Sequence, residues 1–334
     1  MFDGPRPTFS LSWSENKDFV CSTHTLKLWV AQMELRHLRY FIAVAEEGSL
    51  TNAAERRLYT AQPSLSRQIR DLELEVGAKL LQRKARGIAL TPAGLVFLDH
   101  ARLVLLQIDM ATEAARRAEQ PAKAGFAVGF LTGQEVVWLP DTLRLLREEA
   151  PDIEILISSH SSPELARALM RGKLDVAFLR HETETAGLAF RFLAKEPLIV
   201  VLPASHRLAA RRSVRLQEIA RETYISMGAV APVLNAVIDD YAARNGIALK
   251  RAYEAENISA AISLITSTGG VTLFPYTVHN MLPSSVVARP LHGEAPTIDL
   301  MMGYNKSNTS RLLKRFLSRG DELVTRAAQK PNSL

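Results

Sequence analysis

One stretch of the chain, Ser49 to Val76, holds amide, hydroxyl and guanidinium groups at helical spacing. Groups of these types hydrogen-bond to base edges in the major groove of DNA and neutralise its phosphates. The candidate DNA-contacting residues in this stretch are Thr60, Gln62, Pro63, Ser64, Ser66, Arg67 and Arg70. Their chemistry predicts a DNA-binding surface, although a pair of short helices is also common in any α-rich domain.

Two short amphipathic helices in succession would position these side chains. Their apolar positions are Ala53, Ala54 and Leu58 in the first helix, and Leu65, Ile69, Leu72 and Val76 in the second. Tyr59, Thr60 and Ala61 separate the two runs, and a proline such as Pro63 is accommodated in the first turn of a helix. The spacing predicts a helix-turn-helix whose second helix enters the major groove.

The segment after the second helix is basic. No carboxylate occurs from Val76 to Leu98, and Lys79, Arg83, Lys84 and Arg86 gather just before Gly87. We interpret it as a two-stranded wing in which Lys84 and Arg86 are candidates for contact with the DNA backbone or minor groove. The alternative is an ordinary solvated surface.

The stretch from Met33 to Gly94 resembles the winged helix-turn-helix of the LysR-type transcriptional regulators. The segments that carry the resemblance are MELRHLRYFIAVAEEGSLTNAAERR, AQPSLSRQIRDLE and LLQRKARGIALTPAG. One departure is visible between Ala54 and Gln62, where this chain is one residue longer than the commoner family spacing, with Arg56 and Arg57 in tandem. The departure leaves the exact placement of the turn open.

The composition bounds the class of protein. The chain has 334 residues, 47% of them hydrophobic, so it can bury large cores, and its length predicts two or three domains. The formal net charge of +6 and the isoelectric point near 9.5 are compatible with a polyanionic partner. A single cysteine, Cys21, leaves no intramolecular disulfide and no sign of an oxidising compartment. Without a membrane-length apolar run or a secretory signal pattern, we expect a cytoplasmic protein with no membrane partner.

The N-terminal part divides into three expected segments. Residues 1–32 lack sustained periodicity and are expected to be a flexible extension, arising from an upstream start codon or forming an arm that touches DNA or a partner. Residues 33–91 form the expected DNA-binding domain, in which a helix over Glu34 to Glu46 ends at Gly48. Residues 92–120 form the expected linker.

The linker reads as one long helix. Its apolar residues recur at alternating steps of four and three, the repeat of a helix packed along a partner helix, at Phe97, Ala101, Val104, Ile108, Ala111, Ala115 and Ala118. It is either a core helix of a larger domain or a dimerising linker, and its place between two domains favours the linker. A dimer would present two recognition helices to a two-fold symmetric DNA site.

Residues 121–334 change in character. Short apolar runs alternate with helical runs: FAVGF, Val136 to Glu149, IEILI, Leu165 to Arg171 and LDVAF, then LIVVL, TYISM, Val233 to Asn245, ALKRAY and Ile258 to Thr266. This alternation predicts βαβ units with a largely parallel sheet, followed by GGVTLF and a surface helix over Arg311 to Ala328. We expect two lobes, the first at about 125–197 and 268–328 and the second at about 198–267.

This C-terminal part is also similar to the effector-binding domain of LysR-type regulators, whose lobes are built like periplasmic solute-binding proteins. Local agreements are Leu139 with Pro140, and the segments GKLDVAFLR, LPASHRLA and GGVTLFP. The expected fold is therefore α/β overall, with a winged helix-turn-helix, a long linker helix and a two-lobed effector domain.

Ligands of two-lobed α/β folds occupy the crevice at the carboxyl ends of the strands. Backbone N–H groups of Thr132, Gly133 and Gln134, which follow the first strand and precede a helix, could hold a carboxylate. Ser161 and Ser162 follow the second strand, and their hydroxyls could be ligand donors, although helix capping is the default role of serine at such a position.

Other candidate ligand residues are placed further along the chain. Arg180 follows LDVAF and could pair a carboxylate bidentately or form a structural salt bridge. Pro232, Val233 and Phe274 are candidates for the apolar walls of a ring site, or simply for the core.

The resemblance also suggests the ligand class and the partners. VGFLTGQEVVWLP and LDVAFLRH are similar to the branch of the family that senses aromatic acids, although that branch commonly has a serine where Gly133 stands. The resemblance implies promoter DNA, a small aromatic or related carboxylate, assembly of homodimers into homotetramers, and contact with RNA polymerase.

Enzyme classes find little support. The sequence has no GxSxG, GxxxxGK[ST] or strand-linked GxGxxG, and its eight histidines show no metal-ligand spacing beside acids. We expect no catalytic residue, metal or cofactor. The alternative hypothesis is a ligand-binding α/β module, or an enzyme acting on a small carboxylate, without DNA function; the residues before Pro121 argue against it.

Overall fold

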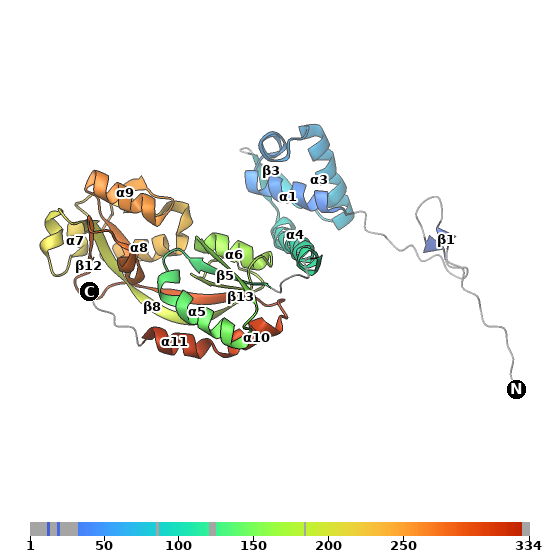
Figure 1. Cartoon of the computed structure of the whole chain (residues 1–334). Coiled ribbons are helices and arrows are strands. Elements are labelled where there is room, and N and C mark those ends of the chain that lie inside the picture. The colour runs from blue at the N-terminus through green and yellow to red at the C-terminus, as the bar shows by residue number, and fades with distance from the viewer. Residues whose placement is uncertain are drawn as a thin grey trace. The chain divides into compact units, whose positions relative to one another are not determined.

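The computed structural model describes residues 12–13, 19–20, 33–84, 87–119, 125–183 and 185–328 (Figure 1). These residues fall into two compact units, Met1–Leu105 and Leu106–Leu334. Within residues 1–32, two short strands, β1 (Ser12–Trp13) and β2 (Phe19–Val20), pair antiparallel. The rest of the expected extension lies outside the described residues.

Three helical segments and a hairpin build the DNA-binding part of the first unit. They are α1 (Leu35–Glu47), α2 (Leu50–Asn52) continued by the π-helix η1 (Ala53–Leu58), α3 (Gln62–Val76), β3 (Leu81–Lys84) and β4 (Gly87–Leu90). Phe41, Leu65 and Leu72 are fully buried in their common core. The helix-turn-helix and the two-stranded wing expected from the apolar spacing are both present.

The long helix α4 (Pro92–Glu119) forms as one continuous element. Phe97 and Ala101, the first members of its apolar stripe, pack in the core of the first unit. Val104 and Ile108 are 44% and 38% exposed. Val104 and Ile108 are therefore the exposed apolar positions that follow on the stripe, because the core of the first unit uses its beginning.

A seven-stranded sheet organises the second unit, in the order β11-β8-β13-β7-β5-β6, with β12 also paired to β8. The strands are β5 (Gly125–Leu131), β6 (Glu154–His160), β7 (Val176–Leu179), β8 (Leu188–Pro203), β11 (Thr272–Pro275), β12 (Val286–Pro290) and β13 (Thr297–Asn305). Parallel pairing joins β5 to β6 and β7, whereas β8 and β13 run antiparallel to each other. The expected parallel pairing is therefore found in this sheet only among β6, β5 and β7. The long strands β8 and β13, which complete the sheet, pair antiparallel.

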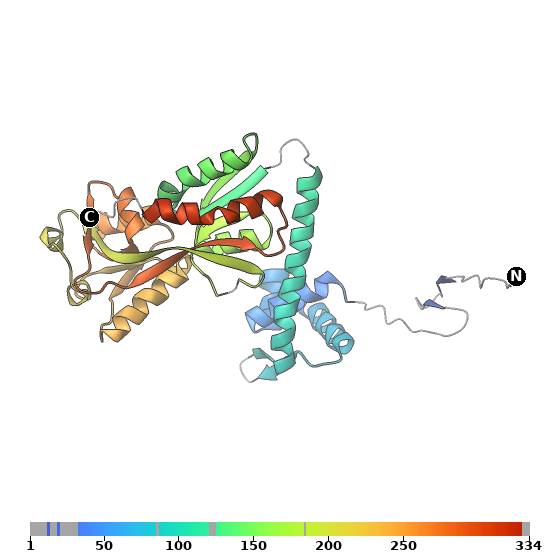
Figure 2. The ribbon, with the colours of Figure 1, turned by 90° about the horizontal axis from the view of Figure 1, so that it is seen from below.

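Helices cover both faces of the first lobe (Figures 1 and 2). On one face, α5 (Glu135–Glu149), α10 (Arg311–Ser318) and α11 (Gly320–Ala328) bury Trp138, Leu145 and Phe316 against the sheet. On the other, α6 (Ser162–Met170) buries Leu165 and Leu169. The expected single C-terminal helix is two helices, because the chain turns at Arg319, which follows the last residue of α10.

The second lobe has its own core around the far half of β8. Its other elements are η2 (Arg207–Ala210), α7 (Leu216–Ile219), β9 (Tyr224–Ser226), η3 (Gly228–Val230), α8 (Pro232–Arg244), β10 (Arg251–Glu254), α9 (Ile258–Thr268) and η4 (Tyr276–Met281). Leu273 of β11 and Val286 of β12 pack in this core, although the sequence analysis assigned both to the first lobe. The return to the first lobe is made by β13, because β11 and β12 flank the far half of β8.

None of the helices in the described part of the chain is long and apolar enough to cross a membrane.

Candidate functional site

The helix α3 presents its predicted polar residues outward. Leu65, Ile69 and Leu72 are buried, so the opposite face of the helix turns to solvent. The positions around its N-terminus are exposed or half-buried: Thr60, Gln62, Pro63, Ser64, Ser66, Arg67 and Arg70. Pro63 stands in the first turn, as its missing N–H allows.

The two arginines of this face are held only loosely by the protein. Arg67 approaches Asp71 at 3.9 Å, and its side chain is 80% exposed. Arg70 donates from Nε to the Ser66 carbonyl oxygen at 3.2 Å. Exposed pairs of this kind contribute little to stability, so both guanidinium groups can exchange these contacts for DNA phosphates or bases.

A buried carboxylate joins α3 to the wing. Glu73 accepts hydrogen bonds from the Leu80 and Leu81 N–H groups at 2.9 and 3.1 Å, and from Lys79 Nζ at 2.7 Å. Burial disfavours its ionised form, but the hydrogen bonds from Lys79, Leu81 and Leu80 outweigh burial and lower the pKa of Glu73. Since the contact spans the end of α3 and the start of β3, it fixes the wing relative to the recognition helix.

The wing is a tight hairpin that leans on the end of α1. Lys84 pairs with Gly87, and the Ile88 N–H donates to the Gly48 carbonyl oxygen at 2.8 Å. A Cβ atom at residue 87 would lie 2.6 Å from that same oxygen, so the close approach requires glycine. Lys84 is exposed, as a phosphate-contacting residue must be, whereas Arg86 lies outside the described residues.

The extra residue between Ala54 and Gln62 is taken up by the π-helix η1. Ala53 and Ala54 stay buried, and the Thr60 N–H donates to the Ala54 carbonyl oxygen at 3.0 Å. Tyr59, at φ 49°, is left-handed and makes the turn. The turn therefore lies at Tyr59 to Ala61, and the insertion is absorbed upstream of it. π-Bulges are rare and concentrate at functional sites.

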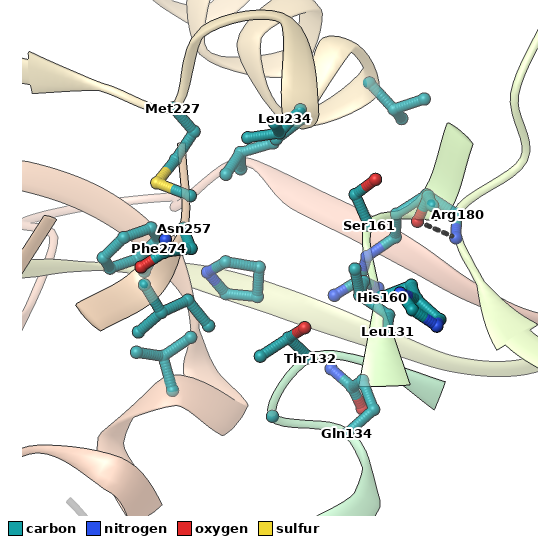
Figure 3. Close-up of a pocket in the computed structure, with 18 of the residues that line it drawn as sticks. Leu131, Thr132, Gln134, His160, Ser161, Arg180, Met227, Leu234, Asn257 and Phe274 are labelled. Carbon is teal, nitrogen blue, oxygen red and sulfur yellow. Dashed lines mark hydrogen bonds between the residues drawn. The ribbon is translucent and has the colours of Figure 1, made fainter. Parts of the chain in front are cut away.

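A second candidate site is a cavity of about 580 Å³ between the two lobes (Figure 3). Residues from the ends of β5, β6 and β7 line one side, and residues of the second lobe line the other. The predicted ligand residues in its lining are Thr132, Gly133, Gln134, Ser161, Ser162, Arg180, Val233 and Phe274. Pro232 was also predicted, but it is not among the lining residues.

Arg180 lies at the centre of a buried polar network. It is 4% exposed, and its Nη2 pairs with Glu196, which also accepts from Gln134 Nε2 at 3.1 and 3.2 Å and from the Thr277 hydroxyl. Within the described residues, its Nη1 is buried and has no hydrogen-bond partner. Arg180 therefore forms a structural ion pair with Glu196 through Nη2. Its Nη1 is left as a donor for another acceptor.

The loop after β5 does not offer the expected cradle of N–H groups. Thr132 N–H donates to His160 O at 3.2 Å, Gly133 N–H to Glu135 Oε2 at 2.8 Å, and Gln134 N–H to Leu131 O at 2.8 Å. The Glu135 carboxylate thus occupies the anion position at the start of α5. The sequence did not show that the side chain of Glu135, the first residue of α5, would turn back to the Gly133 N–H.

Gly133 has a reason to be glycine. Its φ is +97°, and an added Cβ would lie 2.7 Å from Met281 Sδ. A serine at this place, as in the resembling branch, would be strained and would collide with Met281. The hydroxyl closest along the chain, that of Thr132, accepts from Ser159 Oγ at 3.1 Å.

The two serines after β6 have structural partners. Ser161 precedes the first residue of α6, and its hydroxyl and N–H contact Glu164 Oε2 at 2.7 and 3.0 Å. The hydroxyl of Ser162 accepts from the Arg180 N–H at 2.9 Å. Capping, the alternative role considered for Ser161, agrees with these contacts, and Ser162 positions the backbone of Arg180.

Several residues that line the cavity belong to no sequence motif and were not predicted. Glu182 is 8% exposed, and burial raises its pKa although Arg167 opposes the shift. Met227 and Asn257 lie across the cavity from Arg180 (Figure 3). Glu196, which pairs with Arg180, was not predicted to be a site residue. The one signal for it in the sequence is a carboxylate just before Pro197 and the apolar run that follows.

A winged helix-turn-helix, a long helix and a two-lobed unit with a cavity between its lobes together define a ligand-responsive, DNA-binding regulator. The comparison with protein families agrees. Residues 35–95 match the bacterial regulatory helix-turn-helix protein of the lysR family, and residues 119–321 match the LysR substrate binding domain. The chain belongs to the LysR family of transcriptional regulators.

Individual relatives cover nearly the whole chain. The Hca operon transcriptional activator HcaR of Escherichia coli K12 is 37% identical over 291 residues, which cover 86% of this chain and 96% of HcaR. Full-length BenM is similar in structure, with a TM-score of 0.53 at 26% identity over 90% of this chain and 100% of BenM. Full-length CbnR complexed with its target DNA has a TM-score of 0.51 at 26% identity, over 89% of this chain and 100% of CbnR.

Proposed function

We propose that this regulator responds to a small aromatic or related carboxylate bound between the two lobes. The observation that carries this proposal is Arg180 Nη1, a buried cationic donor that has no partner in the described residues and belongs to a cavity-lining side chain. An unsatisfied buried donor is costly, and an ionised carboxylate is its strongest complement.

The walls of the cavity favour a flat apolar body. Phe274, Met227, Leu234, Val278 and Ile258 line it, and its volume of about 580 Å³ lies within the usual range of small-molecule sites. A ring placed against these side chains would bury apolar surface while its carboxylate reaches Arg180. The pairing of one cationic donor with an apolar wall supports an aromatic acid over a sugar.

The DNA-binding domain is proposed to read a promoter through α3. In this assignment Thr60, Gln62, Pro63, Ser64, Ser66, Arg67 and Arg70 contact bases or phosphates at the major groove, while Lys84 and Arg86 contact the backbone or minor groove. The exposed, weakly held guanidinium groups of Arg67 and Arg70 support it.

The proposal also covers how copies of the chain assemble and where its domains begin and end. LysR regulators bind DNA as oligomers, and the exposed apolar part of α4 around Val104 and Ile108 is where two copies of this chain would pair. We assign 33–91 to DNA binding, 92–120 to the dimer helix and 121–334 to effector binding, with dimers joining into tetramers. The protein would act in the cytoplasm, regulate aromatic compound catabolism, contact RNA polymerase and catalyse no reaction.

Ligand binding would act by shifting the closure of the lobes. A ligand changes an equilibrium only if it binds the two states unequally, so the acid must contact both lobes in one state more than in the other. The cavity lining drawn from both lobes supports such a difference.

A thermal-shift experiment tests the ligand class. The full chain should be stabilised by several aromatic acids, by about 2.7 kcal/mol when an acid is present at a hundred times its dissociation constant. Sugars and uncharged aromatic amides of the same size are the controls and should give no shift. Stabilisation by sugars or free amino acids, with none by aromatic acids, would overturn the proposal.

A further inference from the structure

We infer that the effector carries a single carboxylate and that its far end is a neutral hydrogen-bond donor or a cation, not a second carboxylate. The inference rests on the proposed function, since it assumes an acid held at Arg180. It follows from the unequal distribution of charge around the cavity.

The lining holds many more acids than free cationic donors. Its carboxylates are Glu164, Glu182, Glu254 and Glu256, and its titratable nitrogen groups are those of Arg180 and His160. Arg180 is already paired with Glu196. Among the described residues, Arg180 Nη1 is a buried cationic donor without a hydrogen-bond partner, which is enough for one carboxylate.

The acids of the second lobe lie on the wall across from Arg180. Glu254 and Glu256 flank Ala255 just before α9, next to Asn257, and Figure 3 places Asn257 and Met227 on the side of the cavity opposite Arg180. Glu254 Oε1 lies so close to η3 that a Cβ at Gly228 would meet it at 1.8 Å. The far end of a ligand anchored at Arg180 therefore points toward a negative wall.

The wall across from Arg180 also carries an amide, and a further acid lies near Arg180 itself. Asn257 uses its Oδ1 to accept from the Ala260 N–H at 2.8 Å, which leaves its Nδ2 as a donor on this wall. Glu182, near Arg180 in sequence, is 8% exposed and has no side-chain hydrogen bond or ion pair in the described part of the chain. Glutamates of this kind complement hydroxyl or amino groups of a ligand.

The acids do not form a metal site. No group of three or more His, Cys, Asp or Glu side chains within the described residues could hold a metal ion. A second ligand carboxylate would then face Glu254 and Glu256 without a bridging cation, and we expect the repulsion between like charges to weaken binding by about ten-fold.

Matched ligands test the inference in the full chain. Benzoates and cinnamates, each with a para hydrogen, hydroxyl, amino or carboxylate group, keep size and ring constant while the far end changes. By isothermal titration calorimetry, the para-hydroxy and para-amino acids should bind at least about ten-fold more tightly than the para-carboxylate of the same length. Para-carboxylates that bind as tightly as the para-hydroxy acids would overturn the inference and leave the proposed function standing.

A double variant tests whether Glu254 and Glu256 cause the weaker binding of the para-carboxylates. In Glu254→Gln/Glu256→Gln, the penalty for the para-carboxylates should shrink to about three-fold or less, because two like charges are gone. Glu294→Gln, which changes an exposed glutamate outside the lining, is the matched control and should keep the full penalty. An unchanged penalty in the double variant would overturn the inference. If no acid of either series binds the wild-type chain, the proposed function itself fails.

Discussion

The guanidinium of Arg180, a residue that lines the cavity, has one nitrogen paired within the protein and one without a partner. Nη2 is satisfied by Glu196, and Nη1 has no partner among the described residues. A buried ion pair is weak evidence for stability, because desolvation offsets the Coulomb attraction. Its retention at the wall of a cavity is better explained by a ligand that uses the second nitrogen.

This division predicts how Arg180 can be tested without unfolding the lobe. Arg180→Ala would leave Glu196 as an uncompensated buried charge, so the matched change is Arg180→Met/Glu196→Gln, which removes both charges. We expect the double variant to keep the wild-type melting temperature within a few degrees and to lose aromatic-acid binding by at least about 100-fold. Calorimetry and thermal melts measure both quantities. Retained acid binding in a folded double variant would contradict the assignment.

Arg67 offers a second test at the residue scale. Arg67→Ala should weaken binding to DNA from the promoter region beside the gene and reduce the slope of log affinity against log salt by about 1, because one phosphate contact is lost. Fluorescence anisotropy at several salt concentrations measures the slope. Arg244→Ala, on an exposed surface of the second lobe, is the control. Equal affinities and slopes for wild type and Arg67→Ala would remove Arg67 from the interface.

Glu73 predicts a pH dependence of the wing. Its pKa is lowered in the folded chain from the ordinary 4.5, so it stabilises the fold above that value, and the stabilisation is lost as the pH falls below it. Glu73→Gln should destabilise the contact by about 1–2 kcal/mol at neutral pH and flatten its acid sensitivity. Hydrogen exchange of the Leu80 and Leu81 amides measures both effects. Equal acid sensitivity in the variant would show that another group is responsible.

At the scale of elements, η1 shows how a one-residue insertion is tolerated. The π-helical segment keeps Ala53 and Ala54 buried, and Leu65 of α3 remains fully buried in the same core. The turn before α3 lies downstream of η1, and Arg56 and Arg57 lie in the exposed part of η1.

Deletion of Arg56 tests this account. The shortened segment should return to α-helical spacing, and the stability of the domain should change by less than about 1 kcal/mol. Deletion of Ser66, inside α3, should instead rotate the apolar face away from the core and unfold the domain. Hydrogen exchange across α1 and α3 distinguishes the outcomes. Unfolding on deletion of Arg56 would mean that the π-helix is needed for the fold.

The helices and strands could be predicted from the sequence more fully than the contacts between them. The apolar spacing of Leu65, Ile69 and Leu72 determines one face of a helix locally, so α3 could be predicted to within a residue. The placement of β11 and β12 in the second lobe could not, because it depends on antiparallel pairing with the far half of β8. Apolar strands carry the same pattern in either lobe.

The cavity shows the same limit at the scale of side chains. Eight of the nine predicted ligand residues line it, and most of these follow strands whose carboxyl ends meet at one edge of the sheet. The capture of the Gly133 N–H by Glu135 was not predicted, and the salt bridge considered for Arg180 was expected without Glu196 as its partner. Both depend on side-chain directions that neither periodicity nor composition specifies.

For the whole molecule, the two functions must be coupled through free energy. If the acid changes DNA affinity by some factor, DNA must change the affinity for the acid by the same factor. This reciprocity holds whatever path connects the domains. It gives a test that needs no knowledge of how they are arranged.

The most direct measurement is therefore the affinity of the full chain for its best aromatic acid, with and without saturating promoter DNA. Isothermal titration calorimetry provides both values under one buffer condition. The proposed function predicts a change of about five-fold or more, matched by an equal change in DNA affinity on adding the acid. An acid that binds with the same affinity in the presence and absence of bound DNA would contradict the claim that the cavity controls DNA binding.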